Sequence, residues 1–185
     1  MPRRKQLSDD LVLGAAMRVL SQLGPAACTL ADIAAEAGVA TATLIQRFGT
    51  KQGLVVRAIA RDNQTFAETL AQLPHGCSAA SAIAVFLVLT PDIPGGQPIA
   101  DPLLWLRLDM RHPDLNALAA ARLSLLREAV EARLPPLPMS PQLAARLAEA
   151  QWHGALIQWG VERPGRLADY VTESLAAWFS LIVRA

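Results

Sequence analysis

Proline and glycine divide this 185-residue chain into segments that carry helical patterning. Proline cannot donate a backbone hydrogen bond and clashes inside a helix, so most of the 13 prolines are expected between helices. Leu and Ala dominate the composition, whereas β-branched residues are scattered, which favours helix over strand. No stretch alternates as a strand does, and we therefore predict an all-α fold.

About nine helices are expected from apolar residues that recur every third or fourth position. Ser8 and Thr29 are expected N-caps, and Asp32 stands three residues after Thr29, where it suits a reciprocal capping arrangement. Pro74-His75-Gly76 is the clearest boundary in the chain. The expected helices cover about 8–24, 29–37, 41–48, 51–73, 79–89, 99–111, 114–134, 141–161 and 166–184.

The composition excludes several classes of protein. A hydrophobic content of 52% is too high for a disordered chain. The polar N-terminus lacks a secretory signal, and the apolar run 82–89 is far shorter than the roughly 20 residues of a membrane span. We therefore expect a soluble, cytoplasmic protein whose two cysteines, Cys28 and Cys77, stay reduced.

Sequence motifs for catalysis are missing from the chain. It has no nucleophile–base motif, no paired carboxylates at useful spacing and no phosphate-binding glycine loop. The three histidines, His75, His112 and His153, do not have metal-ligand spacing. An enzyme is the weakest of the functional hypotheses, and neither a metal nor a cofactor is expected.

The charge is distributed unevenly. Residues 1–62 carry eight Lys and Arg against five acids, whereas the remainder carries nine against eleven. A basic front on an acidic body is a weak indication of a polyanionic partner.

Two short expected helices meet at Gly38, a spacing typical of a helix-turn-helix whose second helix enters the DNA major groove. At about 100° per residue, Leu44 and Phe48 fall together and face inward, while Ala42 and Gln46 point outward. Thr43 and Arg47 lie on one flank of that outward face. Gln can read adenine, and Arg can read guanine or hold a phosphate. By spacing alone, an ordinary helical turn with a solvated face fits equally well.

The segment TLADIAAEAGVATATLIQRFGTKQGLVVRAI resembles the DNA-binding signature of TetR-family transcriptional regulators. The resemblance covers roughly 50 residues near the N-terminus. Its matching positions are Thr29, Ile33-Ala34, Ala37-Gly38-Val39, Thr43-Leu44, Phe48-Gly49, Thr50 and Lys51.

Three positions depart from the family pattern. Ala40 stands where the family has a Ser or Thr cap, and Thr41 is expected to take over that cap with a shift of one residue. Ile45 and Gln46 stand where the family has a phosphate-contacting Tyr and a second aromatic residue. We infer altered phosphate anchoring rather than lost DNA binding.

The resemblance implies a helix-turn-helix domain at 1–50, a connecting helix at 51–73 and a helical sensor and dimerisation domain at 74–185. Arg3, Arg4 and Lys5 are expected to reach the DNA backbone or minor groove, although a solvated tail is an equal alternative. The candidate DNA-binding residues are Thr29, Thr41, Ala42, Thr43, Gln46, Arg47, Lys51, Arg3, Arg4 and Lys5.

The resemblance also implies a small-molecule effector bound among the helices that precede the last two. The candidate ligand-binding residues are Phe86, Trp105, Leu108, Met110, Leu126, Trp152 and His153. For each aromatic residue a place in the plain core is the commoner outcome, and His153 is most simply a satisfied core histidine.

By resemblance, the last two helices pair with those of a second subunit, and their large apolar residues on most sides favour a homodimer over a monomeric core. The candidate interface residues are Trp152, Leu156, Trp159, Leu175, Trp178, Phe179 and Ile182. The leading hypothesis is a DNA-binding regulator, more specifically a repressor that a small apolar or amphipathic ligand releases from an inverted-repeat operator. The alternative is a helical ligand-binding or interaction protein with weak or lost DNA binding.

Overall fold

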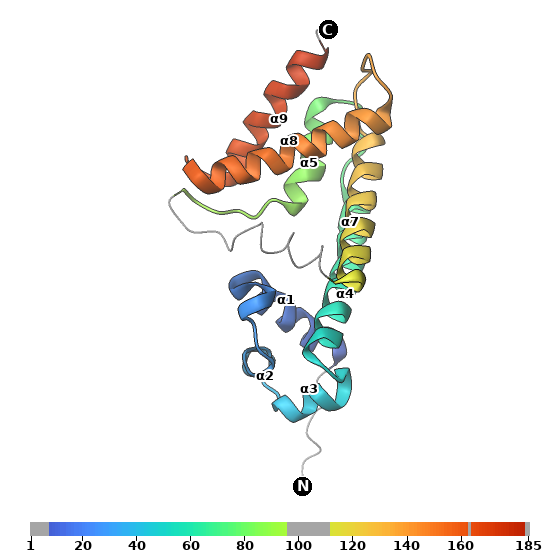
Figure 1. Ribbon diagram of the computed structural model, residues 1–185. Helices are drawn as coiled ribbons and strands as arrows, with labels where there is room; N and C mark the ends of the chain where they lie inside the picture. Colours follow the sequence, from blue (N-terminus) through green and yellow to red (C-terminus); the bar gives the residue numbers. More distant parts are fainter. Residues whose placement is uncertain (1–7, 96–111, 163, 184–185) are drawn as a thin grey trace. The chain divides into compact units, whose positions relative to one another are not determined.

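The structure is a computed structural model that describes residues 8–95, 112–162 and 164–183, and Figure 1 shows its helices. The described residues form helices and connecting turns, which confirms the expected all-α fold for this part of the chain. The helices are α1 (Asp9–Ala27), α2 (Leu30–Ala37), α3 (Thr41–Phe48), α4 (Lys51–Gln72), α5 (Ala79–Leu89), α7 (Pro113–Glu131), α8 (Pro141–Glu162) and α9 (Leu167–Val183). The helix expected at about 99–111 lies outside the described residues.

The chain divides into two compact units, and within the described residues the divisions lie between Thr65 and Phe66 and between Ala119 and Ala120. Each unit has a hydrophobic core of its own. Both divisions fall inside helices, since α4 and α7 each contribute residues to both units.

The first unit is built on α1, α2 and α3, with α2 packed against both of the others. Its core includes Leu20 from α1, Ile33 from α2, Leu44 from α3 and Leu54 from α4, all fully buried. Ala34 is also buried, as expected for a small residue where α2 meets α3. Burial of apolar side chains contributes about 25 cal/mol per Å², so these contacts hold the two short helices in place.

Helix α1 begins where it was expected to begin but ends later than expected. Ser8 caps its start, with the side chain accepting from the backbone N–H of Leu11 at 3.4 Å, as predicted. The expected end at Gly24-Pro25 is a kink instead, because Gly24 has φ 72° while a short helical turn continues to Ala27. Proline is accommodated there because its missing N–H costs nothing in the first turn of a new helical segment.

The second unit packs α9 against both α8 and α5. Its core includes Phe86 of α5, Trp159 of α8, and Leu175 and Phe179 of α9. Helix α7 ends at Glu131, earlier than the expected 134, where a turn precedes Pro135. Among the described residues, none of the helices has the length and apolar character needed to cross a membrane.

Candidate nucleic-acid interface

Helix α2 is held at its start by a reciprocal cap. The Thr29 hydroxyl accepts from the backbone N–H of Asp32 at 3.2 Å, and the Asp32 carboxylate accepts from the backbone N–H of Thr29 at 2.8 Å. The hydrogen bonds from the Thr29 side chain and backbone keep the pKa of Asp32 below its ordinary value. Thr29, a predicted DNA contact, is therefore already engaged within its own helix.

The turn after α2 shows why a glycine stands at position 38. Gly38 has φ 67°, a left-handed conformation that side-chain-bearing residues rarely adopt. Its N–H bonds to the carbonyl of Ala35 at 3.2 Å, and that of Val39 bonds to the carbonyl of Ala34 at 3.0 Å. This pair of bonds is the Schellman arrangement, which ends α2 and redirects the chain into α3.

Helix α3 presents the two faces expected from its sequence. Leu44 and Phe48 are buried, while Ala42 and Gln46 are exposed. Ile45, which stands in place of the family's Tyr, is also exposed. A short α-helix with small and hydrogen-bonding residues on its outer face has the dimensions that fit a DNA major groove.

The start of α3 corrects the expectation for Thr41. Ala40 is the N-cap residue, with extended backbone at φ −77° and ψ 146°, and its methyl group makes no capping bond. Thr41 is the first helical residue rather than the cap. The helix begins one residue earlier than a threonine cap would require, because the turn fixed by Gly38 sets its start.

Arg47 is folded back onto the protein. Its guanidinium forms an ion pair with the Asp9 carboxylate in the first turn of α1 and lies 5.5 Å from the centre of the Phe48 ring. The Arg47 side chain is 18% exposed, against 60% for Asp9. Sequence reasoning placed Arg47 on the flank of the outward face but had no means of finding its partner, 38 residues away.

Helices α3 and α4 approach closely across a two-residue break. Gly49 has φ 78° and ψ −73°, and the backbone N–H of Thr50 bonds to the carbonyl of Phe48 at 3.0 Å, which makes a γ-turn. The Thr50 hydroxyl then accepts from the N–H of Gly53 at 3.0 Å and caps α4. A Cβ at Gly53 would lie 2.6 Å from the Phe48 carbonyl oxygen, so only glycine fits there without a shift.

Two cations of α4 lie at this junction. Lys51 begins α4, as predicted, and its ammonium donates to the carbonyl of Pro25 at 2.9 Å. Arg57, which the sequence reasoning missed, lies 5.6 Å from the Phe48 ring centre and donates to the carbonyl of Arg47 at 3.5 Å. Arg57 lies nine residues after Phe48 and on a different helix, so the helical periodicity of the sequence does not indicate that the two residues are in contact.

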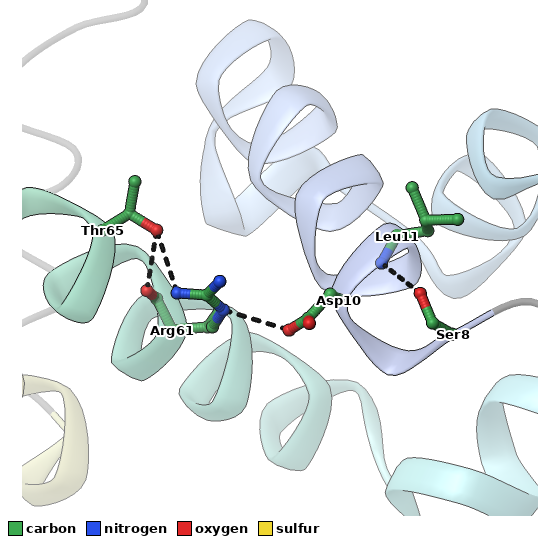
Figure 2. A network of polar contacts seen from close by, with 5 residues as sticks. All are labelled: Ser8, Asp10, Leu11, Arg61 and Thr65. Carbon is green, nitrogen blue, oxygen red and sulfur yellow. Dashed lines mark hydrogen bonds and ion pairs between the residues drawn. The ribbon is translucent and has the colours of Figure 1, made fainter. Parts of the chain in front are cut away.

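A second carboxylate in the first turn of α1, that of Asp10, binds an arginine of α4, Arg61. Arg61 donates to the Asp10 carboxylate at 3.0 Å and to the Thr65 hydroxyl at 3.2 Å. Figure 2 shows these contacts together with the Ser8 cap of α1. Asp9 and Asp10 thus bind Arg47 and Arg61 respectively. Arg3, Arg4 and Lys5 lie outside the described residues, and Thr43 is half-buried on α3.

The described ligand candidates are packed rather than arranged around a cavity. Phe86, Leu126 and Trp152 are buried in the core of the second unit, with the Phe86 and Trp152 ring centres 5.9 Å apart. The Trp152 indole N–H donates to the Thr90 hydroxyl at 3.0 Å. Trp105, Leu108 and Met110 lie outside the described residues.

His153 lies at the edge of this cluster, beside Glu149. Its Nδ1 is 4.0 Å from a Glu149 oxygen, while Arg127 donates to the other oxygen at 3.1 Å. Burial lowers the pKa of His153 below its ordinary value, and the Glu149 carboxylate opposes that shift. A separate apolar groove of about 530 Å³ lies between α5 and α9, lined by Ile83, Leu87, Ala176 and Phe179 among others.

The predicted dimer residues separate into two groups. Trp152, Trp159, Leu175 and Phe179 are buried within the chain and leave almost no side-chain surface for a partner. Leu156, Trp178 and Ile182 are half-buried against the same core. The large apolar side chains of both groups pack in or against the core of the second unit. The sequence pattern alone could not distinguish this core packing from a dimer interface.

Residues 12–58 match the family model described as bacterial regulatory proteins, tetR family. This range contains the helix-turn-helix, most of α1 and the first part of α4. Residues 12–58 therefore carry the DNA-binding region typical of the TetR family. This match supports a DNA-binding transcriptional regulator, with the helix-turn-helix of α2 and α3 in the N-terminal part of the chain.

Solved structures with the same fold extend the likeness beyond the TetR helix-turn-helix. A transcriptional regulator from Rhodococcus sp. Rha1 is 17% identical, with 96% of each chain covered and a TM-score of 0.75. The regulator FadR from Bacillus subtilis in complex with stearoyl-CoA is 16% identical, with 92% of this chain and 97% of that chain covered and a TM-score of 0.62.

The multidrug binding protein EbrR complexed with ethidium is 25% identical, with 95% of this chain and 99% of that chain covered and a TM-score of 0.61. Among curated proteins, none matches the chain significantly.

Proposed function

We propose that the chain is a transcriptional repressor that binds an inverted-repeat operator as a homodimer and is released by a small apolar or amphipathic molecule. The observation that carries this proposal is the outer face of α3, where Ala42 and Gln46 are exposed on a short helix fixed by two turns. Its small side chains permit close approach to base edges, and the Gln46 amide offers the donor and acceptor that adenine pairs with.

An effector would act through linkage between two conformations. A ligand that prefers a conformation with wrongly spaced α3 helices lowers operator affinity by its preference ratio. The apolar composition of the second unit supports an apolar or amphipathic effector. FadR and EbrR, whose structures hold stearoyl-CoA and ethidium, support the same class of molecule.

The dimer is proposed to form on the outer face of α8. Leu143, Leu147, Ala150, Gly154, Ile157 and Val161 are spaced alternately by four and three residues. We call these six residues the α8 seam. Its residues are exposed except Gly154, which is half-buried, and a Cβ at Gly154 would have no atom within 4 Å. Spacing of four and three is the repeat that places apolar residues along the contact line of two packed helices.

Binding-site selection from random duplexes, followed by gel shift, tests the DNA-binding part. We expect an inverted repeat whose half-sites lie about one helical turn apart or a multiple of it. Gln46→Ala should relax the preference at one position of each half-site, by about 1–3 kcal/mol. Gln64→Ala, the same chemical change at an exposed position of α4 outside the helix-turn-helix, is the matched control and should leave the base preference unchanged.

Equal loss of binding for every base at that position would make Gln46 a positioning residue. Failure of the unaltered chain to select any sequence would favour the alternative, a helical ligand-binding protein without DNA binding.

A further inference from the structure

The ion pair between Asp9 and Arg47 joins two groups that have opposite effects on DNA binding. Arg47 is the cation carried by the recognition helix α3, and Asp9 is an acid in the first turn of α1. A carboxylate binds a guanidinium as a phosphate oxygen does, through charge-assisted hydrogen bonds. A DNA phosphate at this flank of α3 therefore meets an arginine whose charge is already neutralised.

The geometry points to Asp9 as an internal counter-ion that a phosphate must displace. We propose that Asp9 occupies Arg47 in the free protein and thereby lowers the affinity of the chain for all DNA. This inference rests on the proposed role of α3 in binding DNA. Since the contact excludes a phosphate from the same donors, displacing Asp9 costs part of the binding free energy on every DNA sequence.

The surroundings of Arg47 explain why a phosphate must replace Asp9 at the guanidinium, since the Arg47 side chain is not free to extend toward the DNA. Its side chain is held between the Phe48 ring and α1 and is 18% exposed. Arg57 approaches the same ring and binds the Arg47 carbonyl, so the backbone end of Arg47 is fixed as well. The Asp9 carboxylate, in contrast, is 60% exposed and can turn into solvent when a phosphate replaces it.

Asp10 provides a matched control one residue along the chain. It carries the same charge in the same helical turn, but its partner is Arg61 on α4 rather than a residue of α3. Neutralising Asp9 or Asp10 changes the net charge equally, and charges are screened beyond a Debye length of about 8–10 Å. A difference between the two variants therefore isolates the effect on Arg47.

The experiment measures the affinity of the full chain for a mixed-sequence duplex at several KCl concentrations. Asp9→Asn should bind about two- to five-fold more tightly than the unaltered chain, as expected when an exposed ion pair no longer competes. Its salt dependence should stay the same as that of the unaltered chain, because the phosphate that displaces Asp9 is neutralised by Arg47 in both complexes. Asp9→Glu, which keeps the charge, should match the unaltered chain, and Asp10→Asn should gain less affinity than Asp9→Asn.

The Arg47→Gln background decides between competition and simple repulsion. There, Asp9→Asn should produce no gain, because the two changes act on one interaction and are not additive. A gain that persists without Arg47, or an equal gain in Asp10→Asn, would overturn the proposal. Weaker binding by Asp9→Asn would also overturn it and make the ion pair a brace for α3. If the unaltered chain binds no duplex, the proposed function itself fails.

Discussion

At the scale of single residues, Arg133 is a buried cation with several backbone partners. Its guanidinium donates to four backbone carbonyls, those of Leu70, Leu73, Pro74 and Ala129, at 3.0 to 3.3 Å. Leu70 and Ala129 lie in the last turns of α4 and α7, where helices leave carbonyl acceptors without an intrahelical partner, and Leu73 and Pro74 follow α4 directly. One side chain thus satisfies the ends of two helices, a role that its sequence position before Pro135 does not reveal.

Replacing Arg133 should destabilise the second unit strongly. We expect Arg133→Ala to lower the free energy of unfolding by about 2–4 kcal/mol, because buried carbonyls lose their donors and a cavity remains. Arg133→Lys should recover part of the loss, since an ammonium has three donors in place of five. Urea unfolding followed by circular dichroism measures both.

Arg18→Ala is the control for Arg133. It breaks an exposed ion pair with Glu36 and should cost less than about 1 kcal/mol. An Arg133→Ala variant as stable as Arg18→Ala would show that water replaces the guanidinium at the helix ends.

At the scale of helices, local sequence predicts the boundaries well where a single residue dictates the backbone. Thr29 and Gly38 were identified in this way, and they mark the start and the end of α2 as predicted. Thr41 was predicted wrongly as the cap of α3, because its position depends on the turn that precedes it. The absent cap is a weak point of the proposed recognition helix.

Restoring the cap should strengthen α3. Ala40 already has the extended backbone that an N-cap requires, so Ala40→Ser should let the hydroxyl accept a first-turn N–H without rearrangement. We expect a gain of about 0.5–1 kcal/mol in the free energy of unfolding of the first unit. The same chemical change at the exposed position 35, Ala35→Ser inside α2, should instead cost about 0.5 kcal/mol.

Thermal and urea unfolding, resolved for the first unit by hydrogen exchange at α3 amides, separate the two serine variants. A loss of stability in Ala40→Ser equal to that in Ala35→Ser would mean that the turn cannot position a capping hydroxyl.

At the scale of the whole molecule, the structure changes which surface a partner is proposed to use. The sequence pointed to Phe179 as an interface residue, yet its side chain is 1% exposed. Phe179→Glu would bury an unpaired carboxylate and unfold the chain, so it would not report on dimerisation. The α8 seam offers residues that can be changed without touching the core.

Ile157→Glu tests the α8 seam. Ile157 is 46% exposed, so glutamate is tolerated in a monomer, but in a dimer two such charges would be buried together. We expect light scattering to show a monomer that binds DNA weakly, with little sequence preference. Leu23→Glu is the control, because Leu23 is 47% exposed but lies on α1, and this variant should remain a dimer. A dimeric Ile157→Glu protein would place the interface elsewhere.

For the described residues, the sequence by itself determined most of the helices, the position of the helix-turn-helix and the outward face of α3, because these follow from local backbone preferences and from apolar spacing within one helix. Gly38, Leu44 and Gln46 each needed only their near neighbours to be placed. The tertiary structure decided the partners of Arg47, Lys51 and Arg133. The partners Asp9, Pro25 and Leu70, respectively, each lie 26 or more residues away along the chain. The tertiary structure also decided which apolar faces of α8 and α9 are core, since burial depends on what packs against a helix, and periodicity records only that a face is apolar.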